Sequence, residues 1–60
     1  MYEGKRYRAM KFGKIWVIID TEDRNLTLHN ANNQLIYSEK KEDIDMFVEK
    51  YNKEGFNRYA

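Results

Sequence analysis

The sequence predicts an α+β domain: a small antiparallel β-meander of three or four strands, followed by one C-terminal α-helix packed on one face of the sheet. Short β-branched and aromatic segments alternate with turns that contain Gly, Asn and Asp, which is typical of strands joined by hairpins. A later segment repeats apolar residues at helical spacing. Closely linked strands pair antiparallel, and the helix then covers one side of their sheet.

The chain has 60 residues, which predicts a single domain, 1–60, with a modest core. A chain of this size buries only about 60% of the surface that its unfolded form exposes, so its stability is marginal. It has no cysteine and one histidine, His29, which excludes disulfides and thiolate metal sites. Efficient packing or association with a partner is then the source of stability.

The first two predicted strands are 5–12 and 14–20, joined at Gly13, a residue suited to a tight turn. The first strand alternates loosely between basic and apolar side chains. The second strand is apolar on both faces, with Ile15, Val17 and Ile19 on one and Trp16 and Ile18 on the other. A strand of this kind is normally central in its sheet and covered on both sides.

Two shorter strands are predicted at 26–29 and 34–37. A charged turn, 21–25, precedes the first of them, and its leucines are expected to point inward. The turn 30–33, between the two strands, is rich in asparagine, which adopts left-handed backbone angles more readily than most residues.

The last predicted element is a helix over 39–54. Ser38 is the expected N-cap, and acidic residues in the following turns suit the helix dipole. Gly55 is placed just after the helix, with Phe56 expected to contact Tyr51 as in a Schellman ending. One apolar stripe, expected to enter the core, consists of Ile44, Phe47, Val48 and Tyr51.

Catalysis, metal binding and membrane insertion are not expected. Nucleophilic catalysis needs a nucleophile, a base and an orienting group, whereas Ser38 suits a cap and His29 a solvated turn. The acidic turn after residue 20 lacks the glycine of a calcium loop, so no metal and no cofactor are predicted. No window approaches the about 20 apolar residues of a membrane span, and no signal-peptide pattern opens the chain. We therefore expect a cytoplasmic protein that is not an enzyme.

Three segments together resemble a pattern of short phage-encoded and prophage-encoded accessory proteins. The segments are IWVIID at 15–20, LIYS at 35–38 and DIDMFVEKYN at 43–52. The resemblance spans about residues 5–55 and concerns a meander with a Trp-bearing strand followed by a capped helix. It implies a protein that binds a host protein and inhibits or adapts it, and it assigns no functional residue.

The preferred functional prediction is a protein-binding module, which could also pair with a second copy. One helix covers one sheet face, so the other face stays apolar at its centre, since strand 14–20 is apolar on both sides. Either Trp16 and Ile18 lie on this open face or, in the reverse assignment, the three aliphatic residues do; a sheet curled into a partial barrel would hide it. Large apolar patches mark interaction sites, and Trp, Tyr and Arg are enriched at hot spots. The predicted partner-binding residues are Trp16, Ile18, Tyr7, Arg6 and Arg8.

The alternative prediction is a small nucleic-acid-binding protein that uses the basic and aromatic N-terminal strand. Nucleic-acid surfaces combine cations that neutralise phosphates with rings that stack on bases. Basic side chains also protect an edge strand from unwanted pairing, and the formal net charge of +1 is far below that of a dedicated nucleic-acid domain. Edge protection is therefore favoured. The residues assigned to the alternative are Lys5, Arg6, Arg8, Lys11, Lys14 and Tyr7.

Overall fold

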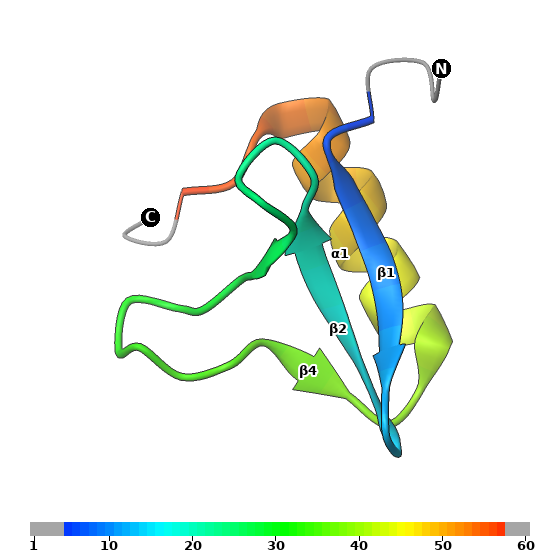
Figure 1. Cartoon of the computed structure of the whole chain (residues 1–60). Helices are drawn as coiled ribbons and strands as arrows, with labels where there is room; N and C mark the ends of the chain where they lie inside the picture. Colours follow the sequence, from blue (N-terminus) through cyan, green and yellow to red (C-terminus); the bar gives the residue numbers. More distant parts are fainter. Residues whose placement is uncertain (1–4, 58–60) are drawn as a thin grey trace.

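The computed structural model describes residues 5–57 as an antiparallel sheet with one helix packed behind it (Figure 1). This arrangement confirms the predicted α+β class, with the strands first and the helix last in the chain. Within the described residues no helix has the length and apolar character needed to cross a membrane. The elements are β1 (Tyr7–Phe12), β2 (Ile15–Asp20), β3 (Leu26–Thr27), β4 (Tyr37–Ser38) and α1 (Lys41–Glu54).

The β-branched strand β2 is central, as its sequence predicts. β1 pairs along one edge of β2, from Tyr7↔Asp20 to Phe12↔Ile15. The loop between these two strands contains Gly13, whose φ of 67° lies in the left-handed region that favours glycine.

The other edge of β2 is shared by β3 and β4, so the sheet departs from a simple meander. β3 pairs with the end of β2 at Ile19 and Asp20, whereas β4 pairs with its beginning at Trp16 and Val17. Between them, residues 28–36 form a hairpin of their own, closed by the bridge His29↔Leu35. Each arm of this hairpin therefore gives only two residues to the sheet. As a result β3 is shorter than the predicted 26–29, and β4 keeps only Tyr37 of the predicted 34–37 and extends to Ser38.

The core lies between α1 and one face of the sheet. It is built on the buried side chains of Tyr7, Ile18, Leu28 and Ile44. Trp16 packs against this cluster, as do Ala9, Ile36, Val48, Tyr51 and Phe56. The helix covers only this face of β2, so the expectation of a strand covered on both sides is not met.

The helix begins two residues later than predicted, and Ser38 is not its N-cap. Lys40 occupies the cap position without a side-chain hydrogen bond. The Ser38 hydroxyl instead accepts a bond from the Lys40 N–H (3.1 Å) and donates one to the Asp43 carboxylate (3.0 Å). Ser38 therefore stabilises the segment that leads into α1, because β4 extends to Ser38 and delays the first helical turn.

The C-terminal end of the helix agrees with the sequence more closely. The Gly55 N–H donates to the Tyr51 carbonyl at 2.7 Å, and Gly55 has a φ of 87°. The Phe56 and Tyr51 rings pack edge to face with 4.8 Å between their centroids. Ile44, Val48 and Tyr51 enter or line the core, but Phe47 is exposed and stacks on Tyr51 from the side.

Candidate binding surface

One face of the sheet is free of the helix. Figure 1 shows α1 behind β1 and β2, and no helix covers the side that faces the viewer. Residues that pair directly across strands share a face, so the register places the members of this face without ambiguity. We call it the open face; it consists of Arg8, Met10, Phe12, Ile15, Val17, Ile19, Thr27 and Tyr37.

The open face exposes large apolar side chains around Val17, which is itself buried. Phe12 is 63% exposed, Tyr37 58% and Met10 40%. Val17 lies between them on the central strand and is fully buried by its neighbours, while Ile15 and Ile19 are half-buried. An apolar patch of this kind on a small protein is typical of an interaction site.

The predicted anchors Trp16 and Ile18 lie on the wrong side of the sheet for this role. Ile18 is fully buried against the helix. Trp16 is half-buried at the edge of the same core, with the Lys41 ammonium 5.5 Å from its ring centre. The reverse assignment is therefore correct, and the aliphatic residues of β2 are the ones that face away from α1.

The side chains of β1 explain why the helix packs on the face of the sheet that contains Trp16 and Ile18. Ala9 pairs with Ile18 and is small enough to let a helix approach, whereas Arg8 pairs with Ile19 on the other side. Covering Arg8 with a helix would bury a charge without a partner, which is costly. Lys11 pairs with Trp16 on the helix side, so each face of 5–12 has one charge and the alternation alone does not decide between the two faces.

Tyr7 and Arg6 also have roles other than the predicted ones. Tyr7 is buried, with its ring 6.1 Å from that of Tyr51. The Arg6 Nε and Nη2 donate to the two carboxylate oxygens of Asp20 at 2.7 and 2.8 Å. Arg6 is therefore held in an ion pair with a buried carboxylate, and of the five predicted partner-binding residues only Arg8 belongs to the open face.

The Arg6–Asp20 pair perturbs both groups. Hydrogen bonds from Arg6 lower the pKa of Asp20, and a bond from the Glu22 N–H (3.0 Å) acts in the same direction, while burial of the carboxylate opposes them. The same pair raises the pKa of the Arg6 guanidinium. Asp20 is only 7% exposed, whereas the Arg6 side chain is 44% exposed, so this pair joins β2 to the segment before β1 at the border of the core.

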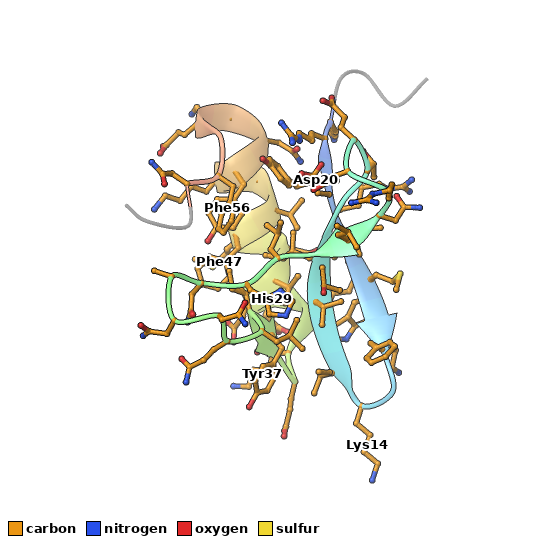
Figure 2. The ribbon with its side chains drawn as sticks, turned by 60° about the vertical axis from the view of Figure 1, so that its left-hand side comes forward. Lys14, Asp20, His29, Tyr37, Phe47 and Phe56 are labelled. Atoms are coloured by element: carbon orange, nitrogen blue, oxygen red, sulfur yellow. The ribbon has the colours of Figure 1, made fainter. Side chains whose placement is uncertain are left out.

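The residues assigned to nucleic-acid binding do not form one surface. Tyr7 is buried and Arg6 is paired, as described above. Arg8 lies on the open face, whereas Lys11 pairs with Trp16 and lies on the helix side. Figure 2 shows Lys14 at the tip of the turn between β1 and β2, pointing away from the protein. Four of the cations are exposed and form no ion pair with any residue in 5–57; they are Lys5, Arg8, Lys11 and Lys14.

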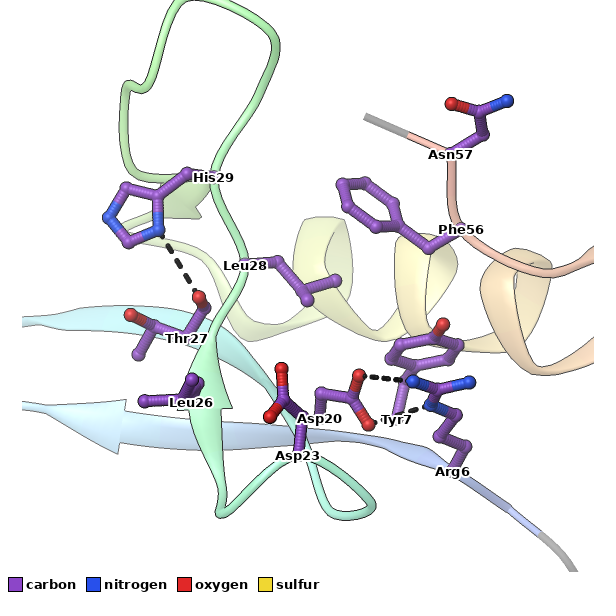
Figure 3. A pocket seen from close by; sticks show the side chains of 10 residues that line it. All are labelled: Arg6, Tyr7, Asp20, Asp23, Leu26, Thr27, Leu28, His29, Phe56 and Asn57. Carbon is purple, nitrogen blue, oxygen red and sulfur yellow. Dashed lines mark hydrogen bonds and ion pairs between the residues drawn. The ribbon is translucent and has the colours of Figure 1, made fainter. Parts of the chain in front are cut away.

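A pocket of about 690 Å³ opens between β3 and the segment that follows α1 (Figure 3). Leu28 and Phe56 lie between its two ends, with the Arg6–Asp20 pair at one end and His29 at the other. The His29 Nδ1 lies 3.2 Å from the Thr27 carbonyl. Among the described residues no group of three or more His, Cys, Asp or Glu side chains is placed to hold a metal ion. The complete lining is Arg6, Tyr7, Asp20, Asp23, Leu26, Thr27, Leu28, His29, Phe56 and Asn57.

Asn52 has a role that sequence reasoning missed. Its Oδ1 accepts a hydrogen bond from the Tyr7 N–H at 2.7 Å, and its Nδ2 donates to the Tyr7 carbonyl at 2.9 Å. The side-chain amide of Asn52 therefore replaces the peptide group of a neighbouring strand beside β1. No local sequence signal marks it, because its partner is 45 residues away in the chain.

The open face and the two polar contacts made by Asp20 and Asn52 are thus the features from which a function can be inferred. No family model, no curated protein and no solved structure matches this chain.

Proposed function

We propose that this chain is a small non-enzymatic binding module that contacts a protein partner through the open face. The observation behind the proposal is the exposure of Met10, Phe12 and Tyr37 around Val17 on the side of the sheet that α1 leaves uncovered. Phe and Tyr offer large contact areas with few rotatable bonds, which makes them efficient at interfaces. An inhibitor or adapter of a host protein is the kind of module that the resemblance to phage accessory proteins implies.

The energy available from these side chains sets the kind of complex to expect. Complete burial of a side chain of this size contributes about 1.5–3 kcal/mol, so burying the exposed fractions of Met10, Phe12 and Tyr37 adds about 2–5 kcal/mol in total. The loss of translational and rotational freedom on association costs about 4–15 kcal/mol. The open face alone therefore supports a weak complex, and a tight one needs further polar contacts from its border.

The test removes the exposed rings and leaves the core intact. We expect the amount of a specific partner bound by the double variant Phe12→Ser with Tyr37→Ser to be lower than the amount bound by the wild type by at least about tenfold. The measurement is quantitative affinity purification from a lysate of the cells in which the chain is produced. Thermal unfolding of each variant checks that the fold persists, since both side chains are more than half exposed.

The matched control is Met46→Ser, because Met46 is 70% exposed but lies on α1. Proteins that depend on the open face are lost from the double variant and kept by this control. Equal retention of every protein by the wild type and the double variant would contradict the proposal.

A second candidate function is the binding of single-stranded nucleic acid. It is favoured by the exposed Arg8 and Lys14, which have no ion-pair partner among residues 5–57, and by the exposed Phe12 ring on the same face as Arg8. This function requires an affinity for labelled single-stranded DNA or RNA that falls steeply with salt. Removing both charges with Arg8→Ala and Lys14→Ala should then reduce the slope of log K against log salt by about 1.4. Fluorescence anisotropy measures both, and no binding at low salt eliminates this candidate.

A further inference from the structure

We infer that the outer edge of β1, from Ala9 to Lys11, is a strand-addition site for an extended acidic and apolar segment of a partner protein. The inference rests on the proposed function, because this edge borders the open face. It deepens that function by naming the polar contacts that the open face lacks and the chemistry of the segment that would supply them. In this mode, main-chain hydrogen bonds give affinity and alternate side chains give specificity.

The direction of the backbone groups of β1 follows from its contacts. In an antiparallel pair, alternate residues exchange hydrogen bonds with the partner strand, and the residues between them point their N–H and C=O groups outward. Both backbone groups of Tyr7 point outward, since both are bonded to Asn52. Ala9 and Lys11 are in the same phase as Tyr7. Their outward groups have no hydrogen-bond partner among residues 5–57.

The outer edge of β1 is blocked at Tyr7 and free of hydrogen-bond partners among residues 5–57 at Ala9 and Lys11. The Asn52 amide occupies the position of a neighbouring peptide group beside Tyr7, so an added strand cannot extend past this residue. From Ala9 to Phe12 the pairing with β2 continues in unbroken register, without a bulge, and the segment contains no proline. Two devices that natural edges use to prevent strand addition, bulges and proline, are therefore missing from this stretch, and a third, basic side chains, opposes a basic strand but not an acidic one.

The charges beside this edge determine the occupant. Arg8, Lys11 and Lys14 are exposed and have no ion-pair partner in the described part of the chain. A second copy of β1 would bring the same cations against them, whereas an acidic strand complements them. The occupant is therefore a segment of a different protein, with acidic residues beside Lys11 on the helix side, while Arg8 and Lys14 oppose the approach of a basic strand.

The side chains of the added strand would alternate between the two faces of the sheet. Those on the open face would lie beside Met10 and Phe12 and extend the apolar patch. Those on the helix side would lie beside Ala9, which leaves room, and beside Lys11, which favours a carboxylate. The segment that fits is thus acidic on one face and apolar on the other.

The experiment removes one outward N–H without changing any side chain. A chain of this length can be made by chemical synthesis, with an N-methyl group on the amide of Ala9. The control bears the same group on the amide of Ala31, an exposed alanine at the second position of the turn closed by the Asn33 N–H and the Asn30 carbonyl. This turn position tolerates a residue without an N–H.

The probe is a synthetic peptide of about seven residues, a typical strand length, with alternating Asp and Val. A second peptide has Lys in place of Asp. We expect the acidic peptide to shift the amide NMR signals of Ala9 and Lys11 and to bind at least about tenfold more tightly than the Lys peptide. N-methylation at Ala9 is expected to weaken binding by at least about tenfold, whereas N-methylation at Ala31 leaves it unchanged.

Several results would overturn the inference. They are equal binding by the Ala9-methylated chain, equal binding of the two peptides, absence of binding by the acidic peptide, and a self-association that N-methylation at Ala9 abolishes, which would make a second copy the occupant. Failure of the proposed function is recognised separately. If Phe12→Ser with Tyr37→Ser leaves partner retention intact while peptide binding still depends on the Ala9 amide, the edge site stands and the open-face function falls. If the double variant loses the partner while peptide binding does not depend on the Ala9 amide, the open-face function stands and the edge site falls.

Discussion

Replacing Ile44 by alanine is expected to lower the free energy of unfolding by about 2–5 kcal/mol, the usual loss when a large aliphatic side chain is truncated in a core. Ile44 is the one fully buried side chain of α1 among the described residues, and it packs into the cluster of Tyr7, Ile18 and Leu28. A chain of 60 residues has a total stability of about 3–9 kcal/mol. The single truncation therefore removes a large part of the total, because Ile44 is the side chain of α1 that is most deeply buried in the core.

Urea denaturation followed by tryptophan fluorescence measures this effect. The chain has one tryptophan, Trp16, which is half-buried against the same core, so its emission reports on the docking of the helix. The control is Met46→Ala, two positions along α1 and largely exposed, for which a change of less than about 0.5 kcal/mol is expected. Similar losses in the two variants would show that the helix is not held by Ile44.

Replacing Asp20 by asparagine is expected to destabilise the fold by about 1–3 kcal/mol, the range for hydrogen bonds to a charged group in a buried setting. Asp20 accepts two bonds from Arg6 and one from the Glu22 N–H. An asparagine of the same shape keeps one acceptor oxygen but loses the charge and presents an amide N–H group to the guanidinium. The loss follows because the Asp20 side chain is only 10% exposed, so water replaces the missing bond only in part.

The same substitution is expected to change how stability depends on pH. The pKa of Asp20 is lowered in the folded chain, whereas an aspartate in an unfolded chain titrates near about 3.9. The contribution of Asp20 is therefore complete above about pH 4, and it is lost as the pH falls through the lower pKa of the folded state.

Urea denaturation at a series of pH values from neutral to acidic tests this expectation. The wild type should lose stability in acid, and Asp20→Asn should lose less. Asp23→Asn is the matched control, since the Asp23 carboxylate is exposed and its nearest cation, Arg24, is 3.7 Å away, an arrangement worth about 0–1 kcal/mol. If Asp20→Asn retains the full acid-dependent loss of the wild type, the Arg6–Asp20 pair is not the source.

Local sequence patterns predicted the type and order of the elements, although β4 keeps only Tyr37 of its predicted range. The doubly apolar run at 15–20 identified the central strand, and Gly13 identified the turn between the two long strands. The spacing of Ile44, Phe47, Val48 and Tyr51 identified the helix, although Phe47 is exposed. These predictions succeeded because each depends on residues that are close together in the sequence, whose hydrophobic periodicity and backbone preferences determine the local structure. Alternation along 15–20 also limited the open face to two possible sets of side chains.

The tertiary structure alone decided which set is open and which backbone edge is free. A period of two separates the faces of a strand but does not say which of two apolar faces meets the helix; that depended on Ala9 and Arg8 across the β1–β2 pairing. Likewise, the sharing of one edge of β2 by β3 and β4, and the closure of β1 at Tyr7 by Asn52, arise from contacts between distant segments. Such contacts form only when the chain has folded, so the sequence pattern within a single segment does not predict them.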